Sequence, residues 1–181
     1  MQPVKIPVER IGVLLGQKGK DKRRLEKASG AKFKIGEEGE VEITAKDPVV
    51  EWRARDVVLA VARGFSPWKA LKLTKDDYYL RVMDLRLMFD SLKQMGRVKG
   101  RIIGEKGRTR KIIEECADVD LCVYGHTVSM IGRLEEVGLA ERAIEMIIEG
   151  AMHSTVYKML ERGRRKLNES RMSLWEERQG A

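Results

Sequence analysis

Residues Gly100–Ile113 read GRIIGEKGRTRKII, in which two glycines bracket a polar pair between an apolar run and a basic run. The same pattern occurs 88 positions earlier, where Gly12–Leu25 read GVLLGQKGKDKRRL. In this register Gly16-Gln17-Lys18-Gly19 corresponds to Gly104-Glu105-Lys106-Gly107. The repeat indicates that the chain contains two copies of one structural unit.

Each copy predicts a helix, a tight turn and a second helix. Two glycines three residues apart let the chain turn sharply and leave no side chain between the backbone and a ligand. The amides at the start of the second helix, together with the positive end of its dipole, attract phosphate. The cations around this exit are Lys18, Lys20, Lys22, Arg23, Arg24, Lys106, Arg108, Arg110 and Lys111. We therefore expect a cradle for a sugar-phosphate backbone.

The composition is that of a globular protein with an anionic partner. The 181 residues, 43% of them apolar, suit one large or two small domains. The net charge of +8 favours a polyanion, because clustered cations gain affinity by releasing counterions from phosphates, although an acidic membrane surface would suit the charge equally. No apolar run approaches the roughly 20 residues of a bilayer span, and the N-terminus lacks a signal-peptide core. We expect a cytoplasmic protein.

The sequence offers little for catalysis or metal binding. Its two cysteines, Cys116 and Cys122, lack CxxC spacing and an accompanying set of histidines. The two histidines, His126 and His153, stand alone in the sequence, whereas a catalytic base needs an oriented partner within reach. We predict a binding protein with no catalytic residues, no metal and no cofactor.

Hydrophobic periodicity predicts the same order of elements, β-α-α-β-β-α, in both copies. The first copy has a strand in residues 1–7, helices in 8–15 and 20–29, a hairpin in 31–45 and a helix from 47 to 64. The second has a strand in 78–83, a helical stretch in 85–95 that lengthens the approach to Gly100, a helix in 108–117, a hairpin in 119–132 and a helix in 134–150. A basic amphipathic helix after Gly150 has no counterpart in the first half.

The pattern of two apolar residues and Gly-x-x-Gly, followed by a basic helix and two strands, resembles the KH RNA-binding domain, whose GxxG loop clamps about four nucleotides of single strand. The resemblance implies an α+β fold with two tandem type I KH domains, each a three-stranded sheet backed by three helices, plus an extra C-terminal helix. The expected parts are KH domain 1 in 1–66, a short helical connector in 67–77, KH domain 2 in 78–150, and a basic helix in 151–181 packed on or near KH domain 2.

The resemblance also implies the binding residues. Gly12 and Gly100 match the position where a small residue lets a base approach the helix, although each could instead ease helix packing. Arg101 matches a position often held by a cation that reaches a base or phosphate, and its counterpart is Val13, so we expect the second groove to read sequence better. The predicted RNA-binding residues are Gly12, Gly16, Gln17, Lys18, Gly19, Lys20, Lys22, Arg23, Lys99, Gly100, Arg101, Gly104, Glu105, Lys106, Gly107, Arg108, Arg110 and Lys111.

A closer resemblance covers nearly the whole chain. The second copy GRVKGRIIGEKGRTRKIIEE, the connector GFSPWKALKL before DDYYLRVMDL, and the basic C-terminal helix are similar to the Partner-of-Nob family of ribosome-maturation proteins, related to the KRR-type assembly factors. The family implies binding of single-stranded RNA at the 3′ end of small-subunit (16S) rRNA, contact with the Nob-type endonuclease that trims it, and association with the pre-small ribosomal subunit.

Two further expectations follow from the family. Eukaryotic members have usually lost the first GxxG, so Gly16 and Gly19 favour an archaeal member and leave open whether the first unit binds RNA or protein. A protein that holds the mature 3′ end would cover the region that pairs with messenger RNA leaders, so translation-initiation components are possible partners.

Two alternatives belong to other functional classes. A general single-strand RNA adaptor in RNA decay would not distinguish ribosomal 3′-end oligonucleotides from scrambled ones. A KH-based protein scaffold would bind RNA with weak salt dependence. The basic C-terminal helix likewise has two interpretations, a phosphate contact or a solvated face over a packed stripe.

Overall fold

The computed structural model describes residues 4–179, with side chains as far as Ser173. The chain forms two compact units, one of residues up to Met83 together with Cys122–Ile131, the other of Asp84–Leu121 together with the residues from Gly132 on. The domain limits expected from the sequence remain a prediction.

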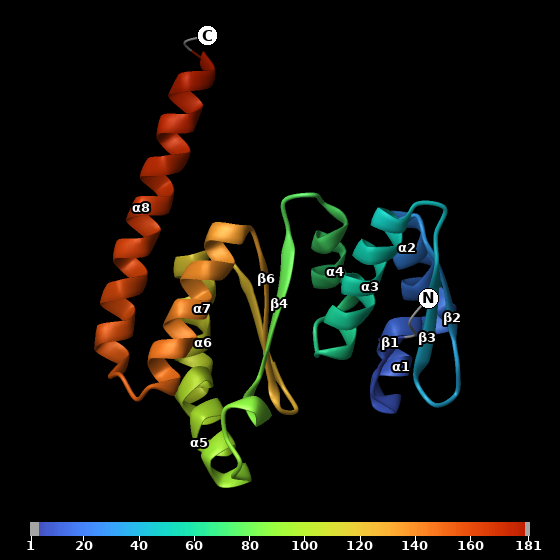
Figure 1. The fold of residues 1–181 in the computed structure, drawn as a ribbon, viewed down its shortest axis with the longest axis horizontal. Helices are drawn as coiled ribbons and strands as arrows, with labels where there is room; N and C mark the ends of the chain where they lie inside the picture. Colours follow the sequence, from blue (N-terminus) through green and yellow to red (C-terminus); the bar gives the residue numbers. More distant parts are fainter. Residues whose placement is uncertain (1–3, 180–181) are drawn as a thin grey trace. The chain divides into compact units, whose positions relative to one another are not determined.

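The first copy of the repeat folds in the predicted order (Figure 1). Its elements are β1 (Val4–Lys5), α1 (Val8–Leu15), the 3₁₀ turn η1 (Gln17–Gly19), α2 (Lys20–Ser29), β2 (Lys32–Ile35), β3 (Glu40–Thr44) and α3 (Pro48–Ala62). The sheet has the order β1-β3-β2, with β3 antiparallel to both neighbours. A short helix α4 (Pro67–Ala70) and a 3₁₀ turn η2 (Leu71–Thr74) follow.

Local sequence explains these elements. Along β2 and β3 the residues alternate, so that Phe33, Val41 and Ile43 are buried while the lysines and glutamates between them are exposed. Helix α3 begins where the Asp47 carboxylate accepts a hydrogen bond from the Val49 amide at 2.9 Å, with proline in the first turn. The core of the first unit therefore lies between one face of the sheet and helices α1 to α3.

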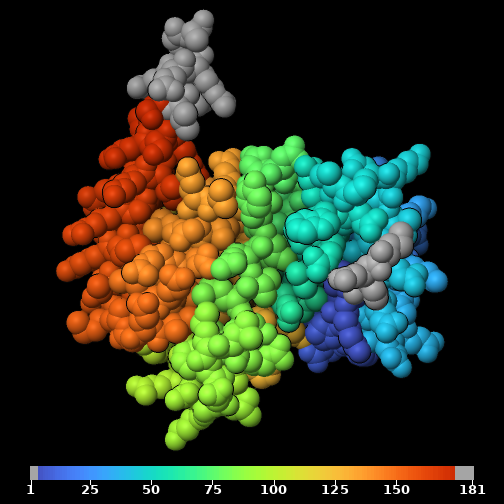
Figure 2. All heavy atoms as spheres, in the orientation of Figure 1, coloured from blue at the N-terminus to red at the C-terminus, as the bar shows by residue number. Residues whose placement is uncertain are grey.

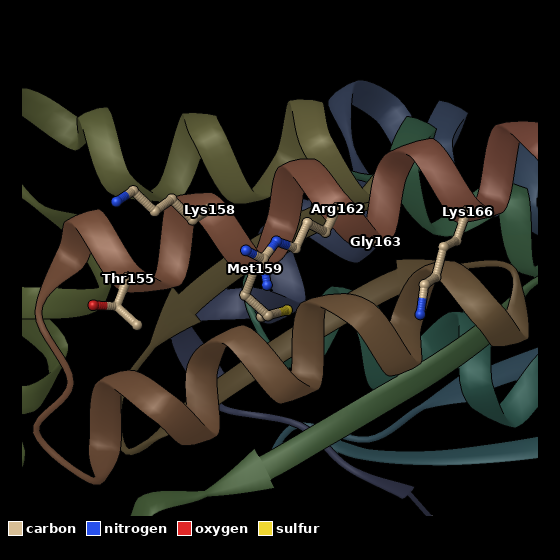
Figure 3. Close-up of a pocket in the computed structure, with 6 residues that line it drawn as sticks. All are labelled: Thr155, Lys158, Met159, Arg162, Gly163 and Lys166. Carbon is tan, nitrogen blue, oxygen red and sulfur yellow. The ribbon is translucent and has the colours of Figure 1, made fainter.

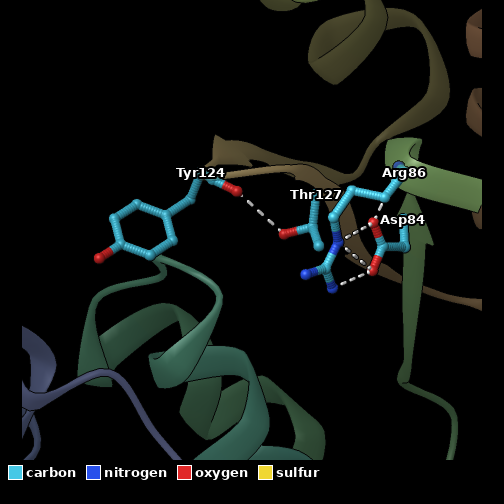
Figure 4. Close-up of polar contacts among 4 residues, drawn as sticks. All are labelled: Asp84, Arg86, Tyr124 and Thr127. Atoms are coloured by element: carbon cyan, nitrogen blue, oxygen red, sulfur yellow. Dashed lines mark hydrogen bonds and ion pairs between the residues drawn. The ribbon is translucent and has the colours of Figure 1, made fainter. Parts of the chain in front are cut away.

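The second copy repeats the plan with additions. Its elements are β4 (Tyr79–Asp84), η3 (Leu85–Leu87), α5 (Leu92–Ile103), η4 (Glu105–Gly107), α6 (Arg108–Ala117), β5 (Asp120–Tyr124), β6 (Thr127–Gly132), α7 (Leu134–Ile148) and α8 (His153–Gln179). The sheet order β4-β6-β5 matches that of the first copy. In the turn before β6, the Thr127 hydroxyl donates to the Tyr124 carbonyl at 3.0 Å (Figure 4). The α+β prediction with two three-stranded sheets is confirmed.

The helical stretch predicted for residues 85–95 is wrong for residues 88–91, which lie between the 3₁₀ turn η3 and the start of α5 at Leu92. The Asp84 carboxylate accepts from the Arg86 amide at 3.0 Å and pairs with its guanidinium at 2.6 Å, which closes the single 3₁₀ turn η3 (Figure 4). Within this turn Leu85 is fully buried, whereas Leu87 is 87% exposed. Asp84 therefore caps the start of the turn, which ends at Leu87, and α5 begins at Leu92.

Helix α8 packs along α6 and α7 (Figure 1), and its outer side, red in Figure 2, carries projecting side chains. Val156 and Leu160, one helical turn apart on α8, are fully buried. A Cβ added at Gly163 would collide with the side chain of Leu139 on α7, so the two helices approach closely there.

The distal half of α8 is held by a buried carboxylate. Glu136, in the first turn of α7, is 2% exposed and accepts from the Arg133 amide at 2.8 Å. Arg171 of α8 pairs with the same carboxylate and lies 3.9 Å from the carboxylate of Asp118. A buried charge of this kind is stable only with its partner in place.

Candidate nucleic-acid interface

The first glycine loop joins α1 to α2. The Gly16 amide donates to the Gly12 carbonyl at 2.9 Å, which ends α1. Gly16 has φ 66° and ψ −178°, a conformation essentially restricted to glycine, and Gly19 has φ 74°. Between them Lys18 is left-handed at φ 53°. The loop therefore turns the chain within four residues, as the GxxG spacing predicts.

The second loop has the same backbone geometry. The Gly104 amide donates to the Gly100 carbonyl at 2.8 Å, and Gly104 has φ 74° and ψ 174°. Lys106 is left-handed at φ 51°, and Gly107 has φ 76°. The sequence repeat is therefore a repeat of structure, residue by residue through the turn.

Both loops leave amides for an external acceptor. The Gly19 and Gly107 amides donate inside their loops, at 3.3 and 3.2 Å. Within the described residues no backbone acceptor is assigned to the amides of the central pairs, Gln17-Lys18 and Glu105-Lys106, whose side chains are exposed. Free amides at a helix start, beside cations, are suited to bind phosphate oxygens.

Gly12 and Gly100 lie on the exposed sides of α1 and α5. A Cβ added at either glycine would meet no heavy atom of the protein within 4 Å. Packing within the protein therefore does not require glycine at these positions. The open surface is compatible with the close approach of a base.

The predicted cations surround the two loops. Lys18, Lys20, Arg23, Lys106, Arg108, Arg110 and Lys111 are exposed, while Lys22, Lys99 and Arg101 are half-buried. Some form pairs one helical turn apart, at 3.9 Å for Lys22–Glu26, 3.5 Å for Arg110–Glu114 and 3.8 Å for Lys111–Glu115. Surface pairs of this kind contribute little to stability, so these cations can exchange their partners for phosphate.

Arg101 lies away from the loop's open amides. Its two terminal nitrogens donate to the carbonyls of Ile147 and Ala151, at 2.6 and 2.5 Å, at the C-terminal end of α7. A cation at that end of a helix is stabilised by the dipole and satisfies carbonyls that have no partner within the helix. An RNA contact by Arg101 remains a prediction.

In the first unit an arginine at a different position of the repeat makes the corresponding hydrogen bonds to the end of a helix. Arg10 of α1 donates to the carbonyls of Val61 and Phe65, at 2.9 and 2.7 Å, at the end of α3. Counted in residues from the start of α3, these two acceptors occupy the same positions as Ile147 and Ala151 do from the start of α7. When the two copies are aligned by the shift of 88 residues, Arg101 falls on Val13 and not on Arg10, which lies about one helical turn earlier. A position-by-position comparison of the two sequences therefore does not pair the two arginines.

Two aromatic residues of α8, which the sequence analysis did not assign, support the second loop. The hydroxyls of Tyr157 and Thr109, the latter in the first turn of α6, lie 2.9 Å apart. His153 Nε2 lies 2.9 Å from the Arg101 carbonyl, and its ring stacks on Tyr157 with centroids 6.0 Å apart. The first copy has no helix equivalent to α8, so the repeat itself gave no signal for these contacts.

A groove of about 450 Å³ runs along α8 (Figure 3). Its lining consists of Thr155, Lys158, Met159, Arg162, Gly163 and Lys166. The three cations are four residues apart and therefore lie on one face of the helix. The two interpretations of this basic helix, phosphate contact or solvated face, both stay open.

Among the described residues, neither a cluster of metal ligands nor an activated Cys116 thiol is found. They contain no group of three or more His, Cys, Asp or Glu side chains that could hold a metal ion. Burial raises the pKa of the Cys116 thiol, and Arg164 opposes this effect only in part, so the thiol is not activated. Of the helices in the described part of the chain, none has the length and apolar character of a bilayer span.

Comparison with known proteins identifies the fold family. A profile described as "Eukaryotic type KH-domain (KH-domain type I)" matches residues 79–165, and a "KH domain" profile matches residues 2–56. The chain is 43% identical over 179 residues to a KH domain-containing protein of Methanocaldococcus jannaschii, which covers 97% of this chain and 79% of the relative. The two KH domains predicted from the glycine loops are confirmed.

Two further comparisons show which family of KH-domain proteins the chain resembles. Over 120 residues the chain is 31% identical to the pre-rRNA-processing protein pno1 of Aspergillus fumigatus, covering 65% of this chain and 48% of that protein. It also matches a chain of a crystal structure of an a/eIF2α–aDim2p–rRNA complex from Pyrococcus horikoshii, with TM-score 0.85, 44% identity, and coverage of 91% of this chain and 94% of that one. The chain therefore belongs to the Dim2/Pno1 family of KH-domain proteins, the Partner-of-Nob family that its sequence resembles.

Proposed function

We propose that this protein binds single-stranded RNA at the 3′ end of small-subunit ribosomal RNA during ribosome maturation, without cleaving it. The observation that carries the proposal is the second glycine loop. There the amides of Glu105 and Lys106 have no assigned backbone acceptor among the described residues, and the exposed cations Lys106 and Arg108 lie beside them. Backbone amides and cations fix phosphates, while Gly100 leaves room for a base.

The relatives support the ribosomal assignment. One relative is a pre-rRNA-processing protein, and a similar chain occurs in a complex that contains rRNA and a/eIF2α. We extend these associations to this protein as proposals: contact with the pre-small subunit, with a Nob-type endonuclease and with translation-initiation components, in the cytoplasm. Bound to the mature 3′ end, the protein would delay initiation until assembly is complete.

The decisive experiment blocks the base site without disturbing the fold. In Gly100→Leu the new side chain projects from an exposed helical position where a Cβ meets no protein atom, so stability should be unchanged or slightly higher. Binding of a labelled oligonucleotide with the 3′-end sequence, followed by fluorescence anisotropy, should weaken at least tenfold. Gly138→Leu is the matched control, because Gly138 is also exposed, helical and free of neighbours within 4 Å.

The same assay distinguishes the alternatives. Equal affinity for the 3′-end oligonucleotide and a scrambled one would replace ribosomal specificity with a general adaptor role. Affinity that hardly changes between low and high salt would favour a protein scaffold, since neutralising several phosphates makes binding fall steeply with salt. Unchanged binding in Gly100→Leu would contradict the proposed base site.

A further inference from the structure

The first two turns of α8 contact both helices that flank the second glycine loop. His153, the first residue of α8, lies with its Nε2 2.9 Å from the carbonyl of Arg101, in the last turn of α5. One helical turn later, the Tyr157 hydroxyl lies 2.9 Å from the hydroxyl of Thr109, in the first turn of α6. The loop between these two helices is therefore held at both of its ends by the same helix.

His153 supplies a donor that the end of α5 lacks. In a continuing helix the Arg101 carbonyl would accept from the amide four residues later, which is that of Glu105. The chain turns at Gly104 instead, and the Glu105 amide has no assigned backbone acceptor among the described residues. Because a carbonyl only accepts, His153 Nε2 carries a hydrogen and donates it to Arg101. His153 thus satisfies the carbonyl while the loop amide stays open to a ligand.

Tyr157 acts on the other side of the loop. A Cβ added at Gly104 would collide with the hydroxyl of Thr109, so this hydroxyl lies against the first glycine of the loop. Thr109 is 3% exposed, and the low dielectric around it strengthens its hydrogen bond to Tyr157. The bond holds the Thr109 side chain in one rotamer and so maintains the packing beneath Gly104.

The two contacts are joined to each other and to the end of α7. The rings of His153 and Tyr157 stack, with centroids 6.0 Å apart. The Arg101 guanidinium donates to the carbonyls of Ile147 and Ala151, in the segment that leads into α8. Arg101 is thus bonded to the start of α8 through its backbone carbonyl and to the end of α7 through its side chain. A shift of the start of α8 would break bonds to the last turn of α5.

We propose that His153 and Tyr157 are positioning residues, which hold the second glycine loop in the shape that binds RNA. Neither residue touches RNA in this proposal, since His153 acts through the Arg101 carbonyl and Tyr157 through Thr109. A loop that is held in its binding geometry beforehand loses less conformational freedom on binding, so affinity rises without a new contact. The inference rests on the proposed RNA-binding function and deepens it, because it assigns residues outside the loop that set the loop's affinity.

A double-mutant cycle tests the role of Tyr157. In the full chain, Tyr157→Phe and Thr109→Val each remove one hydroxyl and keep the shape of the side chain. Each should weaken binding of the labelled 3′-end oligonucleotide about fivefold, the equivalent of one hydrogen bond, and the double variant should bind no more weakly than either single variant. Tyr79→Phe, which removes the hydroxyl of an exposed tyrosine on β4, is the matched control and should bind like the unchanged protein.

A pair of substitutions tests the role of His153. His153→Gln keeps an N–H donor near the position of Nε2 and should retain binding, whereas His153→Leu removes the donor and should weaken binding about fivefold. The dependence of affinity on salt should be the same in every variant, because the number of bound phosphates does not change. Circular dichroism at the assay temperature verifies that each variant is folded, so a loss of stability does not enter the comparison.

Several outcomes would overturn the inference. Unchanged affinity in Tyr157→Phe and His153→Leu would contradict it, as would equal losses in His153→Gln and His153→Leu. Additive losses in the cycle would mean that Tyr157 contacts RNA independently of Thr109, and a flatter salt dependence would mean that a phosphate contact had been lost. Absence of RNA binding by the unchanged protein would instead contradict the proposed function. Weak binding in Gly100→Leu with full binding in the α8 variants would leave the proposed function standing without this inference.

Discussion

The first and second copies of the repeat share a framework beyond their glycines. The Glu26 carboxylate accepts from the Phe33 amide at 2.8 Å, and 88 residues later the Glu114 carboxylate accepts from the Leu121 amide at 3.0 Å. Each bond ties the second helix to the strand that follows it. The surroundings of the two loops differ. In the first copy the carboxylate of Asp21 lies against Gly16, whereas in the second the hydroxyl of Thr109, which is hydrogen-bonded to Tyr157 of α8, lies against Gly104. Local bonds preserve the backbone of a binding loop, while its electrostatics can diverge.

The largest expected effect tests the shared backbone. Gly104→Ala and Gly16→Ala place a Cβ at a glycine-only conformation and against the side chain below the loop, so each should lower the free energy of unfolding by about 3 kcal/mol. Urea denaturation measures the loss. Gly107→Ala, where no atom lies within 4 Å of the new Cβ, should cost only about 1–2 kcal/mol. A smaller loss at Gly104 than at Gly107 would contradict the shared geometry.

The second-largest effects are expected from replacing Arg10 and Arg101, which donate hydrogen bonds to the ends of α3 and α7. Removing the two charged hydrogen bonds in Arg101→Met or Arg10→Met should cost about 2 kcal/mol in each copy, because the carbonyls at the helix end lose a charged donor. Urea denaturation again gives the value, and RNA affinity sharpens the comparison. If Arg101→Met weakens RNA binding far more than Arg10→Met at equal loss of stability, Arg101 also contacts RNA.

The helix-to-strand bonds should have equal and smaller effects. Glu26→Ala and Glu114→Ala each leave one strand amide without its acceptor and should cost about 1 kcal/mol. Glu115→Ala is the control, since its exposed pair with Lys111 should contribute less than about 0.5 kcal/mol. Strongly unequal losses at Glu26 and Glu114 would show that the two frameworks are not equivalent.

The smallest expected effect isolates the support that only the second copy has. Tyr157→Phe removes the hydroxyl next to Thr109 and should cost about 0.5–1 kcal/mol. Hydrogen exchange should become faster at the Gly107 amide, which donates to the Gly104 carbonyl, while exchange at the Gly19 amide of the first loop is unaffected. Faster exchange at both loops would mean that the loss is a general destabilisation rather than release of one loop.

Much of the fold could be predicted because its signals are local. The glycine spacing fixes both turns, and the equivalent apolar residues Leu25 and Ile113 are both fully buried, as their helical spacing indicates. The same reasoning failed at residues 88–91, where the chain leaves the helical conformation between η3 and α5. Periodicity indicates which face of an element is apolar, but it does not indicate whether the helix is continuous along that stretch.

The candidate site was predictable in its backbone and less so in its surroundings. The partners of Arg101 lie 46 and 50 residues away, and Tyr157 lies 48 residues from Thr109, so only the folded chain brings them together. Asp21 was visible in the sequence, but its position against Gly16 depends on how the helix start packs under the turn. Charge counts therefore gave the class of ligand and did not distinguish the two loops.

The ion pair between Glu136 and Arg171 bears on how the C-terminal helix can be studied. A shortened chain that ends before Arg171 would leave the carboxylate of Glu136, which is 2% exposed, without this cation partner. Such a deletion would report on the integrity of α7 as much as on any role of the basic helix in RNA binding. Charge-reversing substitutions at Lys158 or Lys166, which line the exposed groove, leave that internal pair intact and are the cleaner way to examine the helix.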